Sequence, residues 1–210
     1  MSVVVAIKEN GRVYLGADSQ VTYGGSRKSL SNPNNYKIWK LKDAENCLIG
    51  SVGRCRDANV LRILKNVVSE LDVIHNSINF EWVVSTLVPR LFRELEQYSL
   101  LETEGGLHMN SSFLFAYKDQ LFEISSDGCV IEIDDFDAIG SGANQAVGSL
   151  LSTIGNSPTS RITAAIKASA TSDIYVDYPI VLSDTESTEF TVIEKENKKS
   201  EKDNNKNKTE

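Results

Sequence analysis

Short runs of β-branched and apolar residues open the chain and indicate β-strands. Residues 3–7 (VVVAI) and 12–16 (RVYLG) form two such runs, and Asn10-Gly11 lies between them. Asn-Gly between two strand-like runs is the strongest short-range signal for a β-hairpin. The chain is therefore predicted to begin as a hairpin.

The pattern changes from strands to helices after about fifty residues. Residues 19–35 are rich in Gly, Ser and Asn and are predicted to be a loop, while residues 36–41 and 46–50 predict a second strand pair. Four strands thus precede any helix. From Arg56 onward the apolar residues fall at helical spacing and predict one helix, with its apolar positions at Val60, Leu61, Leu64, Val67, Val68 and Leu71.

A second helix is predicted over residues 80–98, with Asn79 as its N-cap and Pro89 as a point of kinking or interruption. Strands joined by tight turns, a meander, should follow it. Two further helices and two short strands then complete the pattern. The predicted ranges are 112–117, 120–124 and 129–133 for the meander, about 143–153 and 160–170 for the helices, and 174–182 and 188–193 for the last strands.

This order of elements predicts an α+β fold rather than a parallel doubly wound sheet, because runs of hairpin-connected strands form antiparallel sheets. Four helices could cover two stacked antiparallel sheets on their outer faces, which gives a four-layer αββα sandwich. One domain is expected over residues 2–193. Residues 194–210 contain no apolar residue and are expected to be a disordered, charged tail.

Composition narrows the function only by exclusion. The formal charge of −7 and the pI near 5.0 argue against a nucleic-acid partner, because binding phosphates requires a basic face. There is no apolar stretch long enough to cross a bilayer, and Lys8 and Glu9 follow the first apolar run where a signal peptide would have its cleavage region. We therefore expect a cytoplasmic protein.

The numbers and spacing of Cys and His do not indicate a metal site, a disulfide framework or a Ser-His-Asp triad. The three cysteines are an odd number and show no metal-binding spacing. The only histidines, His75 and His108, are expected to have structural or surface roles. Neither a metal nor an organic cofactor is expected.

Ser2 is the most informative residue. Aminopeptidases remove an initiator Met that precedes a small side chain, so the mature chain would begin with a residue that carries both a hydroxyl and a free α-amine. One residue then supplies nucleophile and base together. The ordinary pKa of an α-amine, about 7.7 to 8.0, leaves part of it unprotonated at neutral pH.

Four motifs resemble those of the proteasome β-type and HslV-like family of N-terminal-nucleophile hydrolases. The opening residues MSVVVAIKENGRVYLGADSQVT resemble the start of these proteins, in which a small hydroxyl residue precedes a Gly-x-Asp motif. The other three are similar to the strand entry of the catalytic lysine, the Gly-rich turn into the first long helix and the Ile-Gly-Ser-Gly before the third helix. In this chain they are Tyr36-Lys-Ile38, Gly50-Ser-Val-Gly-Arg-Cys-Arg-Asp57 and Ala138-Ile-Gly-Ser-Gly142.

The resemblance implies a role for each matching residue. Ser2 takes the nucleophile position, Lys37 lowers the pKa of the α-amine, and Asp18 holds Lys37. The backbone N–H of Gly53 points at the developing oxyanion. Ser141 helps to hold the amine and its water.

Two features depart from the family pattern. The nucleophile is Ser instead of the usual Thr, which removes the methyl group that restricts χ1. Ser169 stands where a carboxylate usually supports the N-terminus, although Ser172 still supplies a hydroxyl. Ser51 and Cys55 match residues of the substrate pocket, and Cys55 is expected to be a buried small hydrophobe rather than a second nucleophile.

The function that follows is that of an endopeptidase subunit acting on polypeptides. The resemblance also implies a homo-oligomeric ring, fed by an HslU-type unfolding ATPase. Two alternatives stay open: a catalytically inactive structural subunit, and an N-terminal-nucleophile amidase that acts on a small amide.

Overall fold

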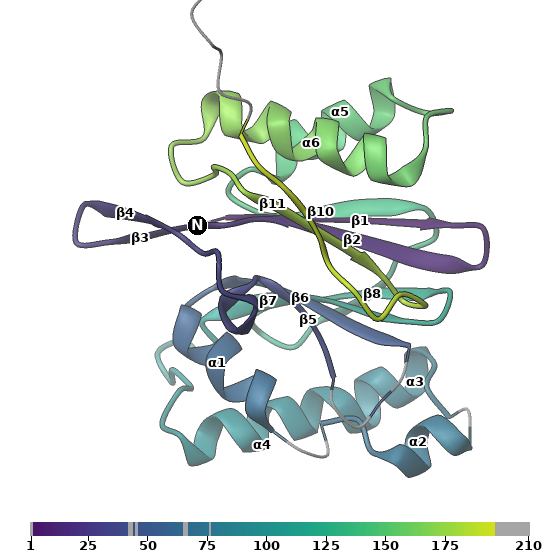
Figure 1. The fold of residues 1–210 in the computed structure, drawn as a ribbon. Helices are drawn as coiled ribbons and strands as arrows, with labels where there is room; N and C mark the ends of the chain where they lie inside the picture. Colours follow the sequence, from purple (N-terminus) through teal and green to yellow (C-terminus); the bar gives the residue numbers. More distant parts are fainter. Residues whose placement is uncertain (1, 42–43, 45, 65–66, 76, 196–210) are drawn as a thin grey trace, which may run out of the picture.

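The computed structural model describes residues 2–41, 44, 46–64, 67–75 and 77–195. They form the expected α+β sandwich of four layers, in which two antiparallel sheets stack face to face and helices cover their outer faces (Figure 1). Of the predicted tail, residues 196–210 lie outside the described residues. No helix in the described ranges combines the length and the apolarity that a bilayer crossing requires.

Each sheet contains five strands. The first has the order β10-β1-β2-β11-β12, and its strands span Phe136–Gly140, Val3–Glu9, Arg12–Asp18, Ile180–Asp184 and Thr191–Ile193. The second has the order β5-β6-β7-β8-β9, with strands at Ile38–Lys40, Cys47–Gly53, Ser111–Tyr117, Gln120–Ile124 and Val130–Glu132. A separate two-stranded hairpin, β3 (Gln20–Tyr23) and β4 (Ser26–Ser29), projects from one end of the molecule (Figure 1).

The helices divide between the two outer faces (Figure 1). The first sheet is covered by α5 (Ala143–Ser152) and α6 (Pro158–Ser172). The second is covered by α1 (Cys55–Ile63), α2 (Glu70–Ile74), α3 (Phe80–Trp82) and α4 (Val88–Gln97), with a π-helical turn at Val83–Leu87 between the last two.

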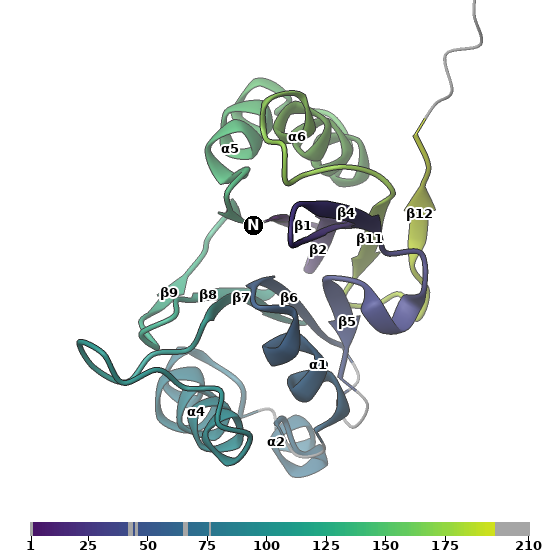
Figure 2. The same ribbon diagram turned by 90° about the vertical axis from the view of Figure 1, so that its left-hand side faces the viewer.

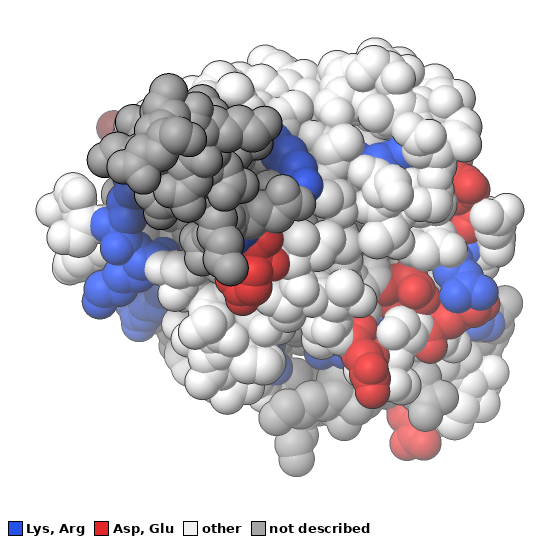
Figure 3. Space-filling view, turned by 45° about the horizontal axis from the view of Figure 1, so that its top comes forward, with Lys and Arg blue, Asp and Glu red and all other residues white. Residues whose placement is uncertain are grey.

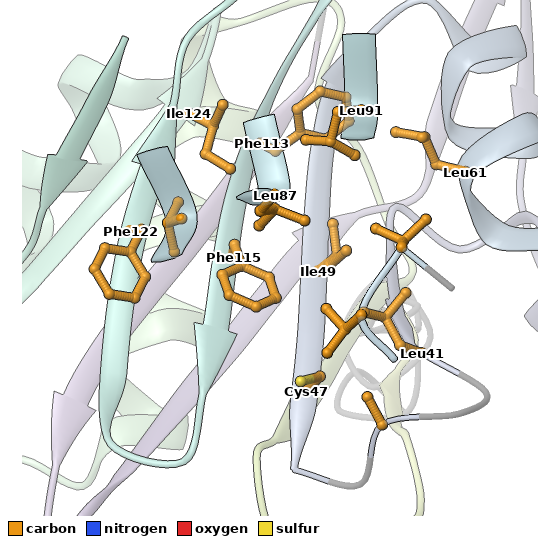
Figure 4. Close-up of a cluster of buried hydrophobic side chains, with 14 of the residues drawn as sticks. Leu41, Cys47, Ile49, Leu61, Leu87, Leu91, Phe113, Phe115, Phe122 and Ile124 are labelled. Atoms are coloured by element: carbon orange, nitrogen blue, oxygen red, sulfur yellow. The ribbon is translucent and has the colours of Figure 1, made fainter. Parts of the chain in front are cut away.

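Three hydrophobic clusters fill the three spaces between layers. Alternate residues of β1 serve two of them: Val3, Val5 and Ile7 pack toward α5 and α6, while Val4 and Ala6 pack between the sheets. This division follows from the two-residue period of a strand. The third cluster joins the second sheet to its helices (Figure 4), with Phe113, Phe115, Phe122, Leu87 and Leu91 among its members.

The predicted opening hairpin is confirmed. β1 and β2 pair antiparallel from Val4–Ala17 to Glu9–Arg12, and the turn residues Asn10 and Gly11 have φ of 55° and 74°. A two-residue turn with positive φ at both positions matches the right-handed twist of the strands, which is why Asn-Gly is favoured there.

The prediction of a loop over residues 19–35 is wrong. Residues 20–29 form the β3–β4 hairpin, and residues 33–35 form a turn of 3₁₀ helix. The turn of the β3–β4 hairpin is Gly24-Gly25, with φ of 54° and 80°. Glycine supplies these positive φ values without steric cost, so the Gly-rich composition marked the turn and not a loop throughout.

The single helix predicted from Arg56 is also wrong, because the chain is extended at Leu64 and a new helix begins after Ser69. Ser69 and Asp72 form a capping box, a helix start signal inside the apolar run. Val67 and Val68 are buried without being helical. Asn79 does cap its helix as predicted, and the interruption expected at Pro89 is found as the preceding π turn.

Two strands of the first sheet differ from the predictions. The strand β10, at Phe136–Gly140, was not predicted, and the strand predicted at 174–182 begins only at Ile180. β10 contains Asp137 and has no hydrophobic alternation, yet it pairs with β1 at five positions. The meander and the two helices after it are confirmed within one to two residues at most ends.

Asp72 joins three helical segments and gives a test of the fold. Its carboxylate accepts hydrogen bonds from Ser69, from Trp82 Nε1 at 3.2 Å and from Arg90 Nη1 at 2.7 Å. Burial alone would raise the pKa of Asp72, but the hydrogen bonds from Arg90 and Ser69 and the charge of Arg90 outweigh it and lower the pKa to about 2.

We predict that Asp72→Asn lowers the free energy of unfolding at pH 7 by about 1 to 2 kcal/mol, the range for losing a cap together with a partly exposed ion pair. Because the folded-state pKa lies below the ordinary 3.8, the contribution is present above that value and is lost as the pH falls toward 2. Urea unfolding at pH 7 and pH 3 measures both effects. Asp119→Asn, in an exposed turn, is the control, and a difference that did not shrink at pH 3 would contradict this account.

Candidate active site

Four of the predicted site residues come together at one end of the sandwich, where the starts and ends of strands from both sheets meet (Figure 2). Ser2 precedes β1 and Asp18 ends β2, and the antiparallel pairing of these strands puts the two residues side by side. Lys37 precedes β5 and Gly53 ends β6 in the other sheet. Stacking of the sheets brings the two pairs into one cluster.

Asp18 is the centre of this cluster and is fully buried. Its Oδ1 accepts hydrogen bonds from the backbone N–H of Val3 at 3.0 Å and from Lys37 Nζ at 2.8 Å. Its Oδ2 accepts from the backbone N–H of Gln20 at 3.0 Å. Lys37 Nζ donates in addition to the carbonyl oxygen of Gln20 at 2.6 Å. Asp18 thus holds the start of β1 and orients the lysine at the same time.

Burial and pairing act in opposite directions on these two groups. Loss of water raises the pKa of Asp18 and lowers the pKa of Lys37, while the attraction between the two charges opposes both shifts. All three donors to Asp18 favour its ionised form. Burial has the larger effect, so the pKa of Lys37 lies below its ordinary 10.5 and the pKa of Asp18 lies above its ordinary 3.8.

The backbone of Ser2 is fixed by the turn after β10. The Ser2 nitrogen donates to Ser141 Oγ at 3.2 Å, and the Ser2 carbonyl oxygen accepts from Ser141 Oγ and from the backbone N–H of Gly142, each at 3.4 Å. A Cβ at Gly140 would lie 2.2 Å from the Ser2 carbonyl oxygen, so this turn requires glycine. In the full-length chain the Ser2 nitrogen belongs to a peptide bond, and it becomes an α-amine only when Met1 is removed.

A pocket that is open to solvent lies next to this cluster. Ser2, Lys37 and Gly53 contribute to its lining, and so do the two residues predicted from sequence to line a substrate pocket, Ser51 and Cys55. The expectation that Cys55 is a buried hydrophobe is wrong: it begins α1 and is exposed.

The turn from β6 into α1 has a conformation that only glycine fits. Gly53 has φ of 117°, and a Cβ there would lie 2.3 Å from the carbonyl oxygen of Asn110. The turn is held by Asp57, which is fully buried and accepts from Ser111 Oγ at 3.0 Å and from Arg54 Nε at 2.8 Å. A side chain at position 53 would thus clash with Asn110 and with Ser111 at the start of β7.

Ser169, which stands where the family usually has a carboxylate, and Ser172, which is predicted to supply a hydroxyl, lie in different environments. Ser169 is fully buried, and its Oγ donates to the carbonyl oxygens of Gly142 at 2.7 Å and Ala165 at 3.1 Å. Its hydroxyl thus fixes the turn that holds Ser2. Ser172 ends α6 and is exposed.

Asp173 is a charged neighbour of the cluster that sequence reasoning did not single out. It caps the C-terminal end of α6, and its charge raises the pKa of Lys37. Its Oδ1 accepts from the backbone N–H of Tyr175, whereas its Oδ2 is buried and has no hydrogen-bond partner within the described residues. The next residue, Ile174, is tied to the cluster because its carbonyl oxygen accepts from the Gln20 side chain at 2.8 Å.

The cluster places a hydroxyl beside a buried lysine–carboxylate pair, and removal of Met1 would add an α-amine that can serve as the base. Within the described ranges there is no group of three His, Cys, Asp or Glu side chains placed to hold a metal ion. His75 and His108 do not line the pocket.

Comparison with solved structures supports the fold. The structure of BPH from Thiobacillus denitrificans in complex with epoxomicin has a TM-score of 0.68 at 18% identity, over 87% of this chain and 97% of that chain. HslV from Trypanosoma brucei has a TM-score of 0.59 at 20% identity, over 87% and 98%. Anbu from Yersinia bercovieri has a TM-score of 0.63 at 14% identity, over 91% and 87%. At these identities the likeness is one of fold.

The family itself follows from the sequence. The family model described as "Proteasome subunit" matches residues 2–169. This segment is well over half of the chain and includes Ser2, Asp18, Lys37 and Gly53. The chain therefore belongs to the proteasome subunit family, as its resemblance to β-type subunits and HslV predicts.

Proposed function

We propose that this chain is an endopeptidase that hydrolyses peptide bonds with Ser2 as its N-terminal nucleophile, after removal of Met1. The observation that supports this most strongly is the buried Asp18–Lys37 ion pair at the start of β1, beside a pocket to which Ser2 contributes. Burying two charges costs several kcal/mol per ion before pairing compensates for it. A pair kept at this position, next to a hydroxyl and an open pocket, fits a role in catalysis.

In the proposed reaction, Ser2 Oγ attacks the carbonyl carbon of the substrate while the Ser2 α-amine takes the hydroxyl proton, directly or through a water molecule. The positive charge of Lys37 lowers the pKa of the amine and keeps more of it in the neutral, basic form. Asp18 keeps Lys37 charged and oriented. The amine then returns the proton to the leaving nitrogen, and water hydrolyses the acyl ester with the amine acting again as base.

The developing oxyanion is assigned to the backbone N–H of Gly53. Loss of one preorganised donor of this kind costs roughly 2.7 to 4 kcal/mol of transition-state stabilisation. Because the turn is held by Asp57 and Ser111, the donor would be fixed before substrate arrives. Preorganisation of this kind avoids a cost of reorientation during the reaction.

Ser141 is proposed to hold the amine after Met1 is removed, because the Ser2 nitrogen already donates to Ser141 Oγ. The carboxylate missing at Ser169 is proposed to be replaced by Asp173, whose negative charge acts on Lys37 from one helical turn further along the chain. Ser172 stays a predicted hydroxyl contributor, reached only if its exposed side chain turns toward the amine.

The assembly is proposed by analogy with the family. Proteasome-type subunits form rings that enclose their sites, so a homo-oligomeric ring is the proposed state, with an HslU-type ATPase as its partner and polypeptides as its substrates. The cytoplasm is the proposed location. The division into a domain at 2–193 and a charged tail at 194–210 belongs to the same proposal.

A non-catalytic structural subunit is the second candidate, and the replacement of the supporting carboxylate by Ser169 favours it. An amidase acting on a small amide is the third. The two differ from the peptidase in observable ways: the structural subunit reacts with no active-site inhibitor, while the amidase reacts but does not cleave peptides.

The decisive experiment is intact-mass analysis of the purified chain before and after incubation with epoxomicin. An epoxyketone needs both the hydroxyl and the free α-amine of one residue, so it reports on the proposed nucleophile directly. We predict a chain that lacks Met1 and gains the mass of one inhibitor molecule. A retained Met1, or an acetylated amine, would remove the mechanism, and a processed chain without adduct would favour the structural subunit.

Substitutions at the cluster should separate catalysis from stability. Ser2→Ala removes the nucleophile and is predicted to lower kcat/KM for fluorogenic peptides at least about a thousandfold, with an unchanged melting temperature. Lys37→Met should lower activity to a similar degree. It also leaves Asp18 as an unpaired buried charge, so it is expected to lower stability by about 3 to 5 kcal/mol.

The double variant Asp18→Asn with Lys37→Met removes both charges and should recover much of this stability while staying inactive. Lys167→Met, at an exposed position of α6, is the matched control and should change neither quantity. Peptide hydrolysis that survives Ser2→Ala would exclude Ser2 as the nucleophile. Asp173→Asn is expected to reduce kcat/KM several-fold only, because its charge acts on Lys37 from outside hydrogen-bonding distance.

A further inference from the structure

The pocket beside Ser2 has an unbalanced charge. Three cationic side chains, those of Lys37, Arg54 and Arg62, line it, whereas no Asp or Glu among the described residues does. Two of the three have a carboxylate partner: Lys37 pairs with Asp18 and Arg54 with Asp57, each at 2.8 Å. Arg62 forms no ion pair within the described residues. The pocket therefore carries one uncompensated positive charge.

This charge stands on the face of α1 that lines the pocket. Cys55, Ala58, Asn59 and Arg62 all contribute to the lining, and their spacing of three, four and seven residues puts them on one side of a helix. Cys55 directly follows the Gly53–Arg54 turn, whereas Arg62 lies two turns further along α1. The helix thus leads from the proposed oxyanion donor to the guanidinium along one wall.

The guanidinium of Arg62 is held in place. Its two terminal nitrogens donate to the carbonyl oxygens of Asn34 and Tyr36, and it lies over the Trp39 ring at 5.0 Å from the ring centroid. Its Nε is buried and has no hydrogen-bond partner within the described residues. Burial lowers the pKa of Arg62 from its ordinary value, because it penalises the charged form, and an adjacent carboxylate would relieve that penalty.

The rim of the pocket adds positive charge. Val21 of β3 lines the pocket and is paired with Lys28 of β4, next to Arg27, and neither basic residue makes an ion pair within the described residues. In Figure 3 basic side chains gather on the side from which the β3–β4 hairpin projects in Figure 1, and acidic side chains gather toward the opposite side. The rim of the pocket is thus locally basic although the chain has a net charge of −7. At physiological salt, charges beyond about 8 Å are largely screened, so the local cations decide what the pocket attracts.

We propose that this pocket binds an acidic side chain, so that the chain cleaves peptide bonds after Glu or Asp, with Arg62 as the residue that determines this preference. The inference rests on the proposed peptidase function. A substrate carboxylate is the group that a guanidinium recognises best, because charge and hydrogen-bond geometry both match. Asn35 and Asn59, also in the lining, offer amide donors to the same group.

The test compares four fluorogenic peptides that are identical except for the residue before the cleaved bond, which is Glu, Gln, Leu or Arg. Glu and Gln have the same shape, so their ratio of kcat/KM isolates the effect of charge. We expect a Glu/Gln ratio of about 10 or more in 50 mM salt, because a carboxylate gains charge-assisted hydrogen bonds that an amide does not. The ratio should fall as salt is raised, and the Arg peptide should be the poorest substrate.

Variants of α1 connect the preference to one side chain. Arg62→Gln is expected to bring the Glu/Gln ratio to about 1, and Arg62→Lys to retain part of the preference, because it keeps the charge but loses the planar fork. Arg56→Gln is the matched control: Arg56 is exposed on the same helix outside the pocket lining and should leave the ratio unchanged. A role of Arg62 in structure alone would alter all four peptides together.

The outcomes separate this inference from the function on which it rests. A Glu/Gln ratio of 1 or below, or a Leu peptide cleaved more than tenfold faster than the Glu peptide, would overturn the acidic preference and leave the peptidase intact. A ratio that survives Arg62→Gln would overturn the assignment to Arg62. No hydrolysis of any peptide, together with no epoxomicin adduct, would remove the peptidase itself.

Discussion

The buried ion pair between Asp18 and Lys37 is the interaction on which the site depends. Asp18 ends a strand of one sheet and Lys37 directly precedes a strand of the other, so the pair joins the two layers at the end where Ser2 lies. The same carboxylate accepts from the backbone of Val3. Asp18 therefore links three features of the site: the stacking of the two sheets, the position of Ser2 and the orientation of Lys37. A change in how the sheets pack would move all three.

Around this pair the backbone is fixed by turns that tolerate no side chain. Gly140 lets the turn after β10 approach the carbonyl of Ser2, and Gly53 lets β6 turn into α1 against β7. Ser169 supports the first of these turns through Gly142 instead of supplying a carboxylate. Asp173 offers negative charge from the end of the same helix. A carboxylate therefore acts on Lys37 from position 173, whereas position 169 holds a serine.

Local signals in the sequence were enough for much of the fold and for the centre of the site. Asn10-Gly11 predicted the hairpin and Asn79 predicted the helix start. The motifs around Asp18, Lys37 and Gly53 predicted one site, and these three residues do lie at the same end of the sandwich. What could not be read locally depends on partners distant in the chain. β10 is a strand because β1 lies beside it, and Asp173 lies near the cluster because the end of α6 meets the strand that carries Gln20. The sequence alone does not distinguish Arg62 from Lys37 and Arg54. The structure does, because only Arg62 of these three lacks a carboxylate partner among the described residues.

The central claim is that the cation of Lys37 keeps the amine of Ser2 neutral enough to act as a base. The most direct measurement is an NMR titration of the α-amine in the mature chain, labelled with ¹⁵N-serine, alongside the Asp18→Asn, Lys37→Met double variant. The account predicts a pKa clearly below the 7.7 to 8.0 of an ordinary α-amine, and a return toward that range in the double variant. A pKa of 8 or above in the unaltered chain, or one that the double variant leaves unchanged, would contradict it.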